Sequence, residues 1–215
     1  MATSTSRPSH RPTHEESAQV DESIRQAAIT TFLDRGYGGA SMDAVAKAAG
    51  VTRKTLYSRY ANKDDMFRSV MHWALREQAD AGFSLDPTLD LRGTLLAIAE
   101  AAQERATSPE TSRLTVLLMS EHERFPKLIP RSDQFGRYPF VQQLADVLER
   151  HQDSGEIPPL DVPVATEHFL AMVLSHPARL AALGMRRDPE KEHRYREGAV
   201  NVFLHGLRGL GPEED

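Results

Sequence analysis

The fold is decided by the stretch SMDAVAKAAGVTRKTLYSRYANKD, residues 41–64. Ser41 is a good N-cap for a short helix that a glycine ends, and Thr52 is a good N-cap for a second helix, expected to reach Tyr60. Two short helices joined by a tight Gly-Val turn are typical of a helix-turn-helix, here residues 41–60. Such a motif lays its second helix in the major groove of DNA.

The segments around this motif are expected to complete a small helical domain over residues 18–78. Apolar residues of the preceding helix recur at i, i+3, i+4, i+7 and i+8 from Ile24, which forms one helix face, and Gly36 is expected to end that helix. Asn62 is expected to cap the helix that follows the motif. Residues 1–17 are rich in Ser, Thr and Pro and lack a periodic apolar pattern, so we expect a disordered arm there.

The remaining chain continues as helices separated by proline and glycine. Five more helices are expected, at residues 91–107, from Pro109 onward, and at 138–151, 164–183 and 188–209. Pro177 is expected to kink or split the fourth of these. No alternating strand pattern of useful length is present. We therefore predict an all-α protein of about nine helices, in which residues 79–215 form a C-terminal helical bundle.

Composition narrows the class of protein. The chain has 215 residues, a formal net charge of −5 and no cysteine, which excludes disulfides, thiolate metal sites and cysteine nucleophiles. No uncharged apolar run approaches the roughly 20 residues that a membrane-spanning helix needs. The segment from Met1 to His14 lacks the apolar centre of a signal peptide. We therefore expect a cytoplasmic protein without a membrane partner.

The charge is distributed unevenly along the chain. Residues 1–70 carry ten basic and eight acidic side chains, a net charge of +2, whereas the other residues carry 16 and 23, a net charge of −7. Between Gly50 and Lys63 four side chains are basic and none is acidic. An acidic chain therefore holds a basic patch on the second helix of the motif, which favours a nucleic-acid partner.

The same stretch resembles the DNA-binding domain of the TetR/AcrR family of bacterial transcriptional regulators, over about residues 17–71. The resemblance is carried by Ala28, Phe32, Gly36-Tyr37, Ser41-Met42, Val45-Ala46, Ala49-Gly50-Val51-Thr52, Thr55-Leu56-Tyr57, Tyr60 and Asn62-Lys63-Asp64. It implies a homodimeric transcriptional repressor that binds a pseudo-palindromic double-stranded DNA operator and is released by a small lipophilic ligand. Two positions depart from the family pattern, Lys54 and Ser58, so the operator cannot be inferred by analogy.

The resemblance also implies which side chains contact DNA. The predicted DNA-binding residues are Ser41, Thr52, Arg53, Lys54, Tyr57, Ser58 and Lys63. The two N-cap hydroxyls are expected to meet phosphates, and Lys63 is expected to hold the DNA backbone. Tyr57 is expected to reach a phosphate or a thymine methyl group. Arg53 and Lys54 are the candidates for guanine O6 and N7, while Leu56 is expected to point into the domain core.

For the second domain the resemblance implies ligand binding and dimerisation. The last two helices are the most apolar, and two copies are expected to pack as a four-helix interface that sets the reading helices about 34–36 Å apart. The candidate pocket residues are Trp73, Met119, His122, Phe125, Phe135, Tyr138, Phe140, Phe169 and Met172. Aromatic and methionine side chains at helical spacing are more often packing residues, so a core role for this set stays open.

No enzyme activity, metal or cofactor is expected. Adjacent residues on a helix point about 100° apart, so His122 cannot share a face with both Glu121 and Glu123. No nucleophile–base pair, Gly-rich phosphate loop or His-Glu-x-x-His pattern is present. Two alternatives stay open: a helical small-molecule or partner-binding protein with a vestigial DNA-reading domain, and an activator in place of a repressor. The sequence names neither the effector nor the operator.

Overall fold

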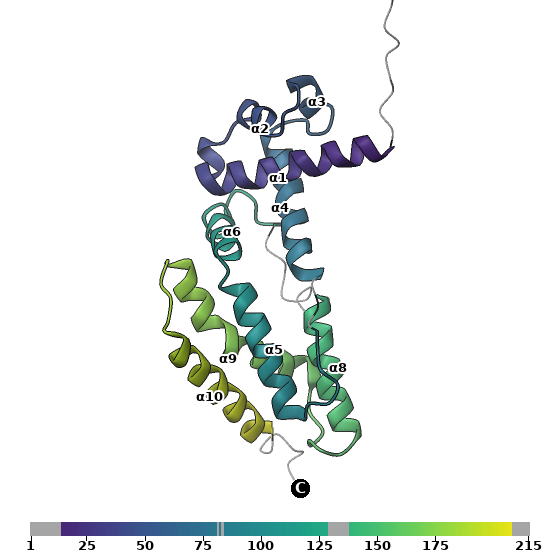
Figure 1. Cartoon of the computed structure of the whole chain (residues 1–215), viewed down its shortest axis with the longest axis vertical. Helices are drawn as coiled ribbons and strands as arrows, with labels where there is room; N and C mark the ends of the chain where they lie inside the picture. Colours follow the sequence, from purple (N-terminus) through teal and green to yellow (C-terminus); the bar gives the residue numbers. More distant parts are fainter. Residues whose placement is uncertain (1–13, 81, 83, 129–137, 208–215) are drawn as a thin grey trace, which may run out of the picture. The chain divides into compact units, whose positions relative to one another are not determined.

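The protein is all-α in the part that the structure describes, which confirms the predicted fold class. The computed structural model describes residues 14–80, 82, 84–128 and 138–207. Within these ranges the chain forms nine helices and no strand (Figure 1). The chain separates into two compact units, residues 1–73 and 74–215.

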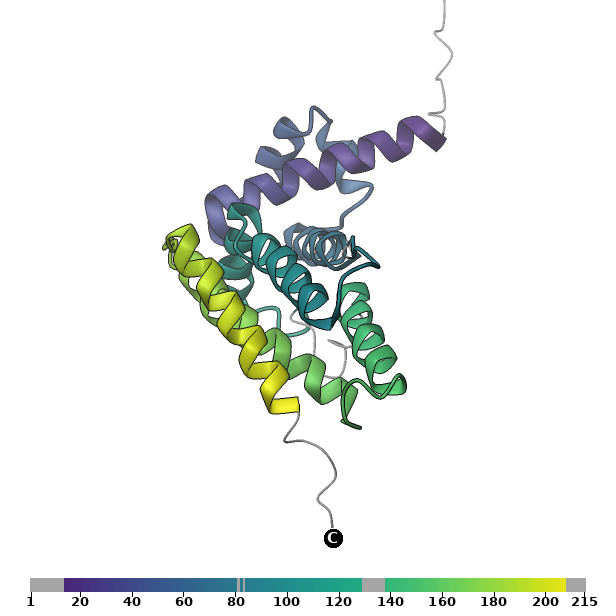
Figure 2. The ribbon, with the colours of Figure 1, turned by 60° about the horizontal axis from the view of Figure 1, so that its bottom comes forward.

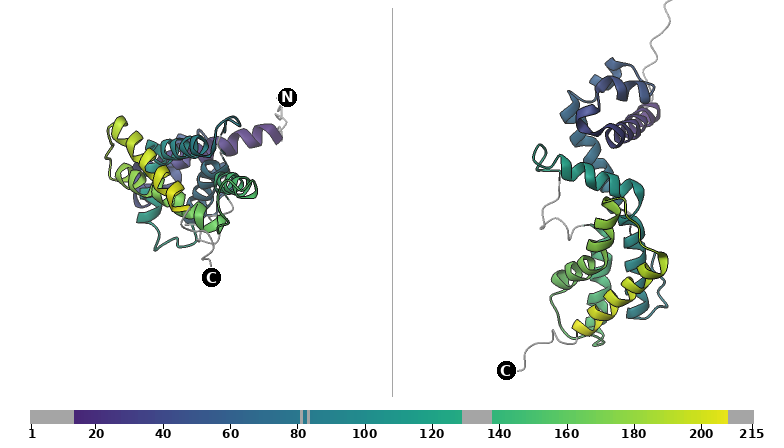
Figure 3. Two further views of the ribbon diagram at one scale, coloured as in Figure 1. Left: turned by 90° about the horizontal axis from the view of Figure 1, so that it is seen from below. Right: turned by 90° about the vertical axis from the view of Figure 1, so that its left-hand side faces the viewer.

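The first unit holds three helices and the beginning of a fourth. They are α1 (His14–Gly39), α2 (Met42–Ala48), α3 (Arg53–Tyr57) and α4 (Lys63–Asp80). Apolar side chains from all of them form the core, and three aromatic rings lie together within it. The ring of Phe67 meets that of Phe32 edge-on, with 4.9 Å between centroids, and that of Tyr37 at 5.1 Å. The right-hand view of Figure 3 looks nearly along α1 and shows α2 packed against it.

α1 begins earlier and ends later than expected. Residues 14–17, which we expected in the disordered arm, form its first turn, and residues 1–13 lie outside the described residues. Two glutamates in this turn face the positive end of the helix dipole, which favours a helix start there. Gly36 breaks the helix as predicted, with φ +66°, but one further helical turn follows and runs to Gly39.

α3 is shorter than expected. It has the predicted N-cap but ends at Tyr57 instead of Tyr60. The hydroxyl of Ser58 donates to the carbonyl of Thr55 at 2.8 Å and closes the helix. The chain then turns toward Asn62, whose side chain accepts a backbone N–H of α4 at 2.9 Å, as predicted. Ser58, which ends α3, and Asn62, which caps α4, are only four residues apart, so the segment between them is too short for another helical turn.

The second unit is a bundle built around one helix. Besides the end of α4 it contains α5 (Leu91–Ala106), α6 (Pro109–Ser120), α8 (Pro139–Asp153), α9 (Val162–Ala182) and α10 (Pro189–Leu207). α9 packs against the other four, and Figure 2 shows α10 lying along it. The buried ring of Phe169 on α9 meets Phe203 of α10 edge-on at 5.0 Å. The helix bounds lie within two residues of the predicted ones.

α9 is not split at Pro177, because another helix supplies the hydrogen bond that the proline removes. Proline has no N–H, so the carbonyl of Val173, one turn earlier, loses its helical partner. The side-chain amide of Gln103 on α5 donates to this carbonyl at 2.9 Å in a buried position. Gln103 Oε1 accepts from Arg196 of α10 at 3.1 Å, and the same guanidinium donates to Glu100 at 2.7 Å. The network therefore links α5, α9 and α10.

Candidate nucleic-acid interface

Buried apolar side chains and local caps fix the orientation of α3. Leu56 is fully buried, as predicted, and lies in the core with Val45 of α2. The hydroxyl of Thr52 accepts the N–H of Thr55 at 3.1 Å and so caps α3. Gly50 has φ +67°, a conformation that side chains with a Cβ rarely adopt, and it makes the turn between the two helices.

The surface around α3 exposes most of the predicted DNA-binding residues. The exposed members of that set are Ser41, Thr52, Arg53, Lys54, Tyr57 and Ser58. Tyr57 is 47% exposed although it is aromatic. Within residues 14–80 the side chains of Lys54 and Tyr57 have no hydrogen bond or ion pair. An unpaired cation beside an exposed ring can bind phosphate oxygens and base edges.

Arg53 lies on the same surface but already has a partner. Its Nε is 2.6 Å from Oδ1 of Asp43 on α2, and the two side chains are 68% and 56% exposed. An exposed ion pair of this kind contributes only about 0–1 kcal/mol, so a phosphate or a guanine can displace Asp43. The hydroxyl oxygen of Ser41 also has a partner, since it accepts the N–H of Ala44 at 3.2 Å.

Lys63 bonds to the protein itself. Its Nζ donates to the carbonyls of Tyr37 at 2.9 Å and Ala40 at 3.1 Å, and lies 4.3 Å from the centre of the Tyr37 ring. The hydroxyl of Tyr37 in turn donates to Asp64. Lys63 therefore ties the start of α4 to the end of α1, and the contact between Lys63 and the DNA backbone stays a prediction.

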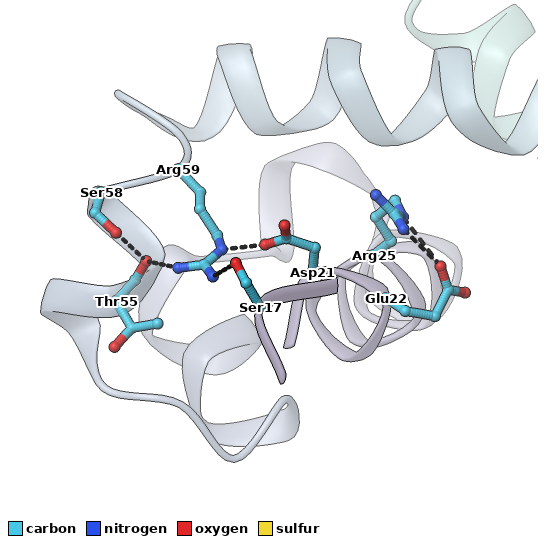
Figure 4. A network of polar contacts seen from close by, with 7 residues as sticks. All are labelled: Ser17, Asp21, Glu22, Arg25, Thr55, Ser58 and Arg59. Atoms are coloured by element: carbon cyan, nitrogen blue, oxygen red, sulfur yellow. Dashed lines mark hydrogen bonds and ion pairs between the residues drawn. The ribbon is translucent and has the colours of Figure 1, made fainter. Parts of the chain in front are cut away.

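Arg59, which follows α3, also bonds to the protein itself (Figure 4). Its guanidinium forms an ion pair with Asp21 of α1 and donates to the carbonyl of Thr55 at 3.4 Å and to Ser17 Oγ at 3.5 Å. The network joins the end of α3 to the beginning of α1. Arg59 is one of the four basic side chains between Gly50 and Lys63, and its partners in α1 were not predicted from the sequence. The available signal was the spacing of Ser17 and Asp21, four residues apart on one side of a helix.

Tyr60 adds no charge to this surface at neutral pH. Its ring is half-buried, and the burial raises the pKa of the Tyr60 hydroxyl above its ordinary value. The group therefore stays neutral, and no negative charge from Tyr60 opposes an approaching phosphate.

Replacing Arg59 by alanine is expected to lower affinity for the operator by about tenfold without changing its dependence on salt concentration. The reason is that α3 loses its bond to α1 while no phosphate contact is lost. Fluorescence anisotropy with labelled operator DNA at several salt concentrations measures both quantities. A drop of about one in the salt slope would instead identify Arg59 as a phosphate contact.

Asp21→Asn is the matched control for this role. It removes a negative charge, so pure electrostatics predicts tighter DNA binding. A positioning role for the pair predicts weaker binding, because Arg59 loses its partner in α1.

The structure does not place the predicted pocket residues around one described cavity. Phe125 and Phe169 are buried, Met119 and His122 are exposed, and Tyr138, Phe140 and Met172 are half-buried. Trp73 belongs to the first unit, where the guanidinium of Arg25 lies 5.6 Å from its ring centre. Phe135 lies outside the described residues. A cleft of about 160 Å³ in the second unit is lined by other residues, so the assignment of these side chains to a ligand pocket stays a prediction.

The described ranges contain neither a metal-binding cluster nor a helix suited to a membrane. Residues 14–80, 82, 84–128 and 138–207 contain no group of three or more His, Cys, Asp or Glu side chains placed to hold a metal ion. Among the helices of those ranges, none combines the length and apolarity that crossing a membrane requires.

The short helices α2 and α3 are joined by a tight turn, and α3 is held by the buried Leu56 while its other side is exposed. This arrangement defines the class of the protein, a helix-turn-helix DNA-binding protein. Residues 24–70 match the family described as "Bacterial regulatory proteins, tetR family". Residues 93–206, more than half of the chain, match the family described as "AefR-like transcriptional repressor, C-terminal domain". The chain belongs to the TetR family of bacterial transcriptional regulators.

Individual relatives agree with this membership. The chain is 31% identical over 99 residues to the HTH-type transcriptional regulator AcrR of Shigella flexneri, a match that covers 42% of this chain and 45% of that protein. It is 24% identical over 156 residues to SrpR of Pseudomonas putida, covering 69% and 68%. A putative TetR-family regulator from Mesorhizobium loti has the same fold, with a TM-score of 0.71 at 24% identity, covering 91% and 98% of the two chains.

Proposed function

We propose that the chain acts as a homodimeric repressor that binds a pseudo-palindromic operator through α3. The observation that carries the proposal is the exposed surface of α3, where Lys54 and Tyr57 have no partner in the first unit while Leu56 holds the helix in the core. Because these side chains are exposed on a helix fixed by packing, they can enter a major groove without unfolding any structure. The family description of residues 93–206 names a repressor, which supports repression over activation.

Dimerisation through α9 and α10 is supported by small and apolar side chains that these helices leave exposed. Val164 of α9 is 45% exposed and Val202 of α10 is 65% exposed. Gly198 and Gly206 of α10 are exposed, and a Cβ added at either would meet no atom within 4 Å. A second copy can therefore approach these helices closely and cover apolar surface. In a two-fold dimer the two α3 helices would read half-sites about 34–36 Å apart.

Release by a small molecule completes the proposed function. A ligand that binds the second unit must favour the state that does not bind DNA by several kcal/mol if it is to switch the regulator fully. Such a regulator works at the chromosome, so we place it in the cytoplasm.

The experiment that tests the proposal measures binding of the full chain to DNA from its own upstream region. Lys54→Ala is expected to weaken binding about 10- to 100-fold and to lower the salt slope by about one if the ammonium meets a phosphate. Tyr57→Ala is expected to weaken binding without changing the salt slope, because the ring carries no charge. Lys127→Ala, an exposed lysine of the second unit, is the matched control and should change neither quantity.

The outcomes of this experiment separate the two candidate functions. Binding that falls steeply with salt and depends on Lys54 and Tyr57 supports the repressor. Binding that is absent at low salt, or that both variants leave unchanged, would favour a ligand-binding protein with a vestigial DNA-reading domain.

A further inference from the structure

A cleft in the second unit lies where three helices approach one another. The ends of α5 and α9, the segment 183–188 and the beginning of α10 form its walls, and it encloses about 160 Å³. The wall from α9 is apolar and consists of Pro177, Leu180 and Ala181. Met185, which is 55% exposed, adds to this apolar wall. None of the pocket candidates predicted from the sequence lines this cleft.

The volume of the cleft limits the size of what it can hold. An apolar cavity of about 150 Å³ holds one benzene molecule. Drug-sized ligands occupy pockets of about 300–1,000 Å³. The cleft therefore fits a single six-membered ring with small substituents, lying against the apolar wall of α9.

Three arginines line the cleft, and one of them is unpaired. Arg196 already donates to two acceptors on α5, and Arg187 lies with its guanidinium 4.4 Å from the centre of the Tyr195 ring. Arg186 is exposed and has no hydrogen bond or ion pair with any residue that the structure describes. A guanidinium binds a carboxylate through two parallel N–H···O bonds. Arg186 is therefore the donor for an acidic substituent on the ring.

Glu192 offers an acceptor that lacks a donor. Its Oε1 is buried without a hydrogen bond in the described part of the chain, while its Oε2 lies 3.8 Å from Arg187. A buried carboxylate oxygen without a donor is unfavourable, and native proteins rarely leave one unsatisfied. Oε1 itself has almost no accessible surface, but the Glu192 side chain is 22% exposed and lines the cleft, so a ligand hydroxyl can donate to its carboxylate when the side chain turns toward the ligand. Glu192 lines the same cleft as Arg186, so one molecule can meet both.

We propose that this cleft binds a small aromatic hydroxy acid, with its ring on the apolar wall of α9, its carboxylate on Arg186 and its hydroxyl donating to the carboxylate of Glu192. The proposal rests on the proposed function in one respect, which is that the bound acid acts as the effector. Gln103 also lines the cleft and donates to the carbonyl of Val173. The ligand therefore contacts the network that joins α5 to α9 and α10, the two helices assigned to the dimer.

The experiment titrates the full chain, without DNA, with para-hydroxybenzoate, benzoate and phenol by isothermal titration calorimetry. We expect saturable binding of para-hydroxybenzoate, at least tenfold tighter than binding of benzoate or phenol, because each of those lacks one of the two polar groups.

Arg186→Ala is expected to weaken para-hydroxybenzoate binding at least tenfold. Glu192→Gln is expected to reduce the preference for para-hydroxybenzoate over benzoate. Arg194→Ala is the matched control, since Arg194 is exposed on α10 outside the cleft, and it should bind as the unchanged chain does.

The outcomes test the binding site, the effector role of the ligand and the proposed function separately. If para-hydroxybenzoate shows no saturable binding, or if Arg186→Ala binds it unchanged, the site is overturned. If it binds but leaves operator affinity unchanged, the effector role is overturned. A chain that fails to bind operator DNA without any ligand overturns the proposed function while the titration still decides the site.

Discussion

Replacing Phe67 by alanine is expected to destabilise the first unit by about 3–5 kcal/mol and to abolish operator binding. Phe67 is fully buried, and its ring meets the rings of Phe32 and Tyr37 at the centre of the core. A single core of about 60 residues rarely supplies more than about 3–5 kcal/mol of stability. The substitution is therefore expected to remove most of the free energy of unfolding of the first unit, which contains α3.

The chain provides its own probe for this prediction. Its single tryptophan, Trp73, belongs to the first unit, so tryptophan fluorescence reports unfolding there while far-UV circular dichroism reports the whole chain. Phe67→Leu is the matched control and is expected to cost only about 1–1.5 kcal/mol, since it keeps most of the buried volume. A fluorescence transition in Phe67→Ala that matches the unchanged chain would contradict the central role of this ring.

Replacing Gln103 by leucine is expected to destabilise the second unit by about 2–4 kcal/mol. The carbonyl of Val173 loses the side-chain amide that donates to it at Pro177, and Arg196 loses one of its two acceptors on α5. A buried carbonyl without a partner costs about 1–3 kcal/mol, and the weakened arginine network adds to this. Denaturant unfolding followed by circular dichroism measures the free energy of unfolding.

A double-mutant cycle isolates the hydrogen bond at the proline. Pro177→Ala restores an N–H that can donate to the carbonyl of Val173 within α9. In that background Gln103→Leu is expected to cost at least 1 kcal/mol less than in the unchanged chain. Equal costs in both backgrounds would show that the bond from Gln103 to Val173 does not replace the missing helical bond.

Local signals allowed much of the fold to be predicted from the sequence. The turn at Gly50, the break at Gly36 and the cap at Asn62 depend on residues close in the chain, and each lies where it was expected. The predicted start of α1 was wrong because two glutamates extend the helix into a segment without an apolar pattern, and the predicted end of α3 was wrong because the Ser58 hydroxyl closes the helix three residues earlier. The sequence left open whether Pro177 kinks or splits α9, because the side chain that donates to the carbonyl of Val173 lies 70 residues from it in the chain.

The candidate site was predicted in part. Exposure of Lys54 and Tyr57 follows from helical spacing, because Leu56 occupies the opposite, buried side of α3. The partners of Lys63 and Arg59 could not be predicted, since they lie 23–26 and up to 42 residues away, respectively. Apolar side chains gave no reliable sign of a pocket, because the same residue types fill the core of a helical bundle. The cleft is instead marked by an unpaired arginine and an unsatisfied carboxylate oxygen.

The bond between Gln103 and the carbonyl of Val173 also has an evolutionary consequence. A proline at position 177 is tolerated only while the facing helix carries a donor that reaches that carbonyl, so the two positions constrain each other. Across the family we expect them to change together: chains without the proline are free to vary at position 103, and chains that keep it retain an amide there. Selection on the proline of α9 therefore also acts on position 103 of α5, 74 residues earlier in the chain.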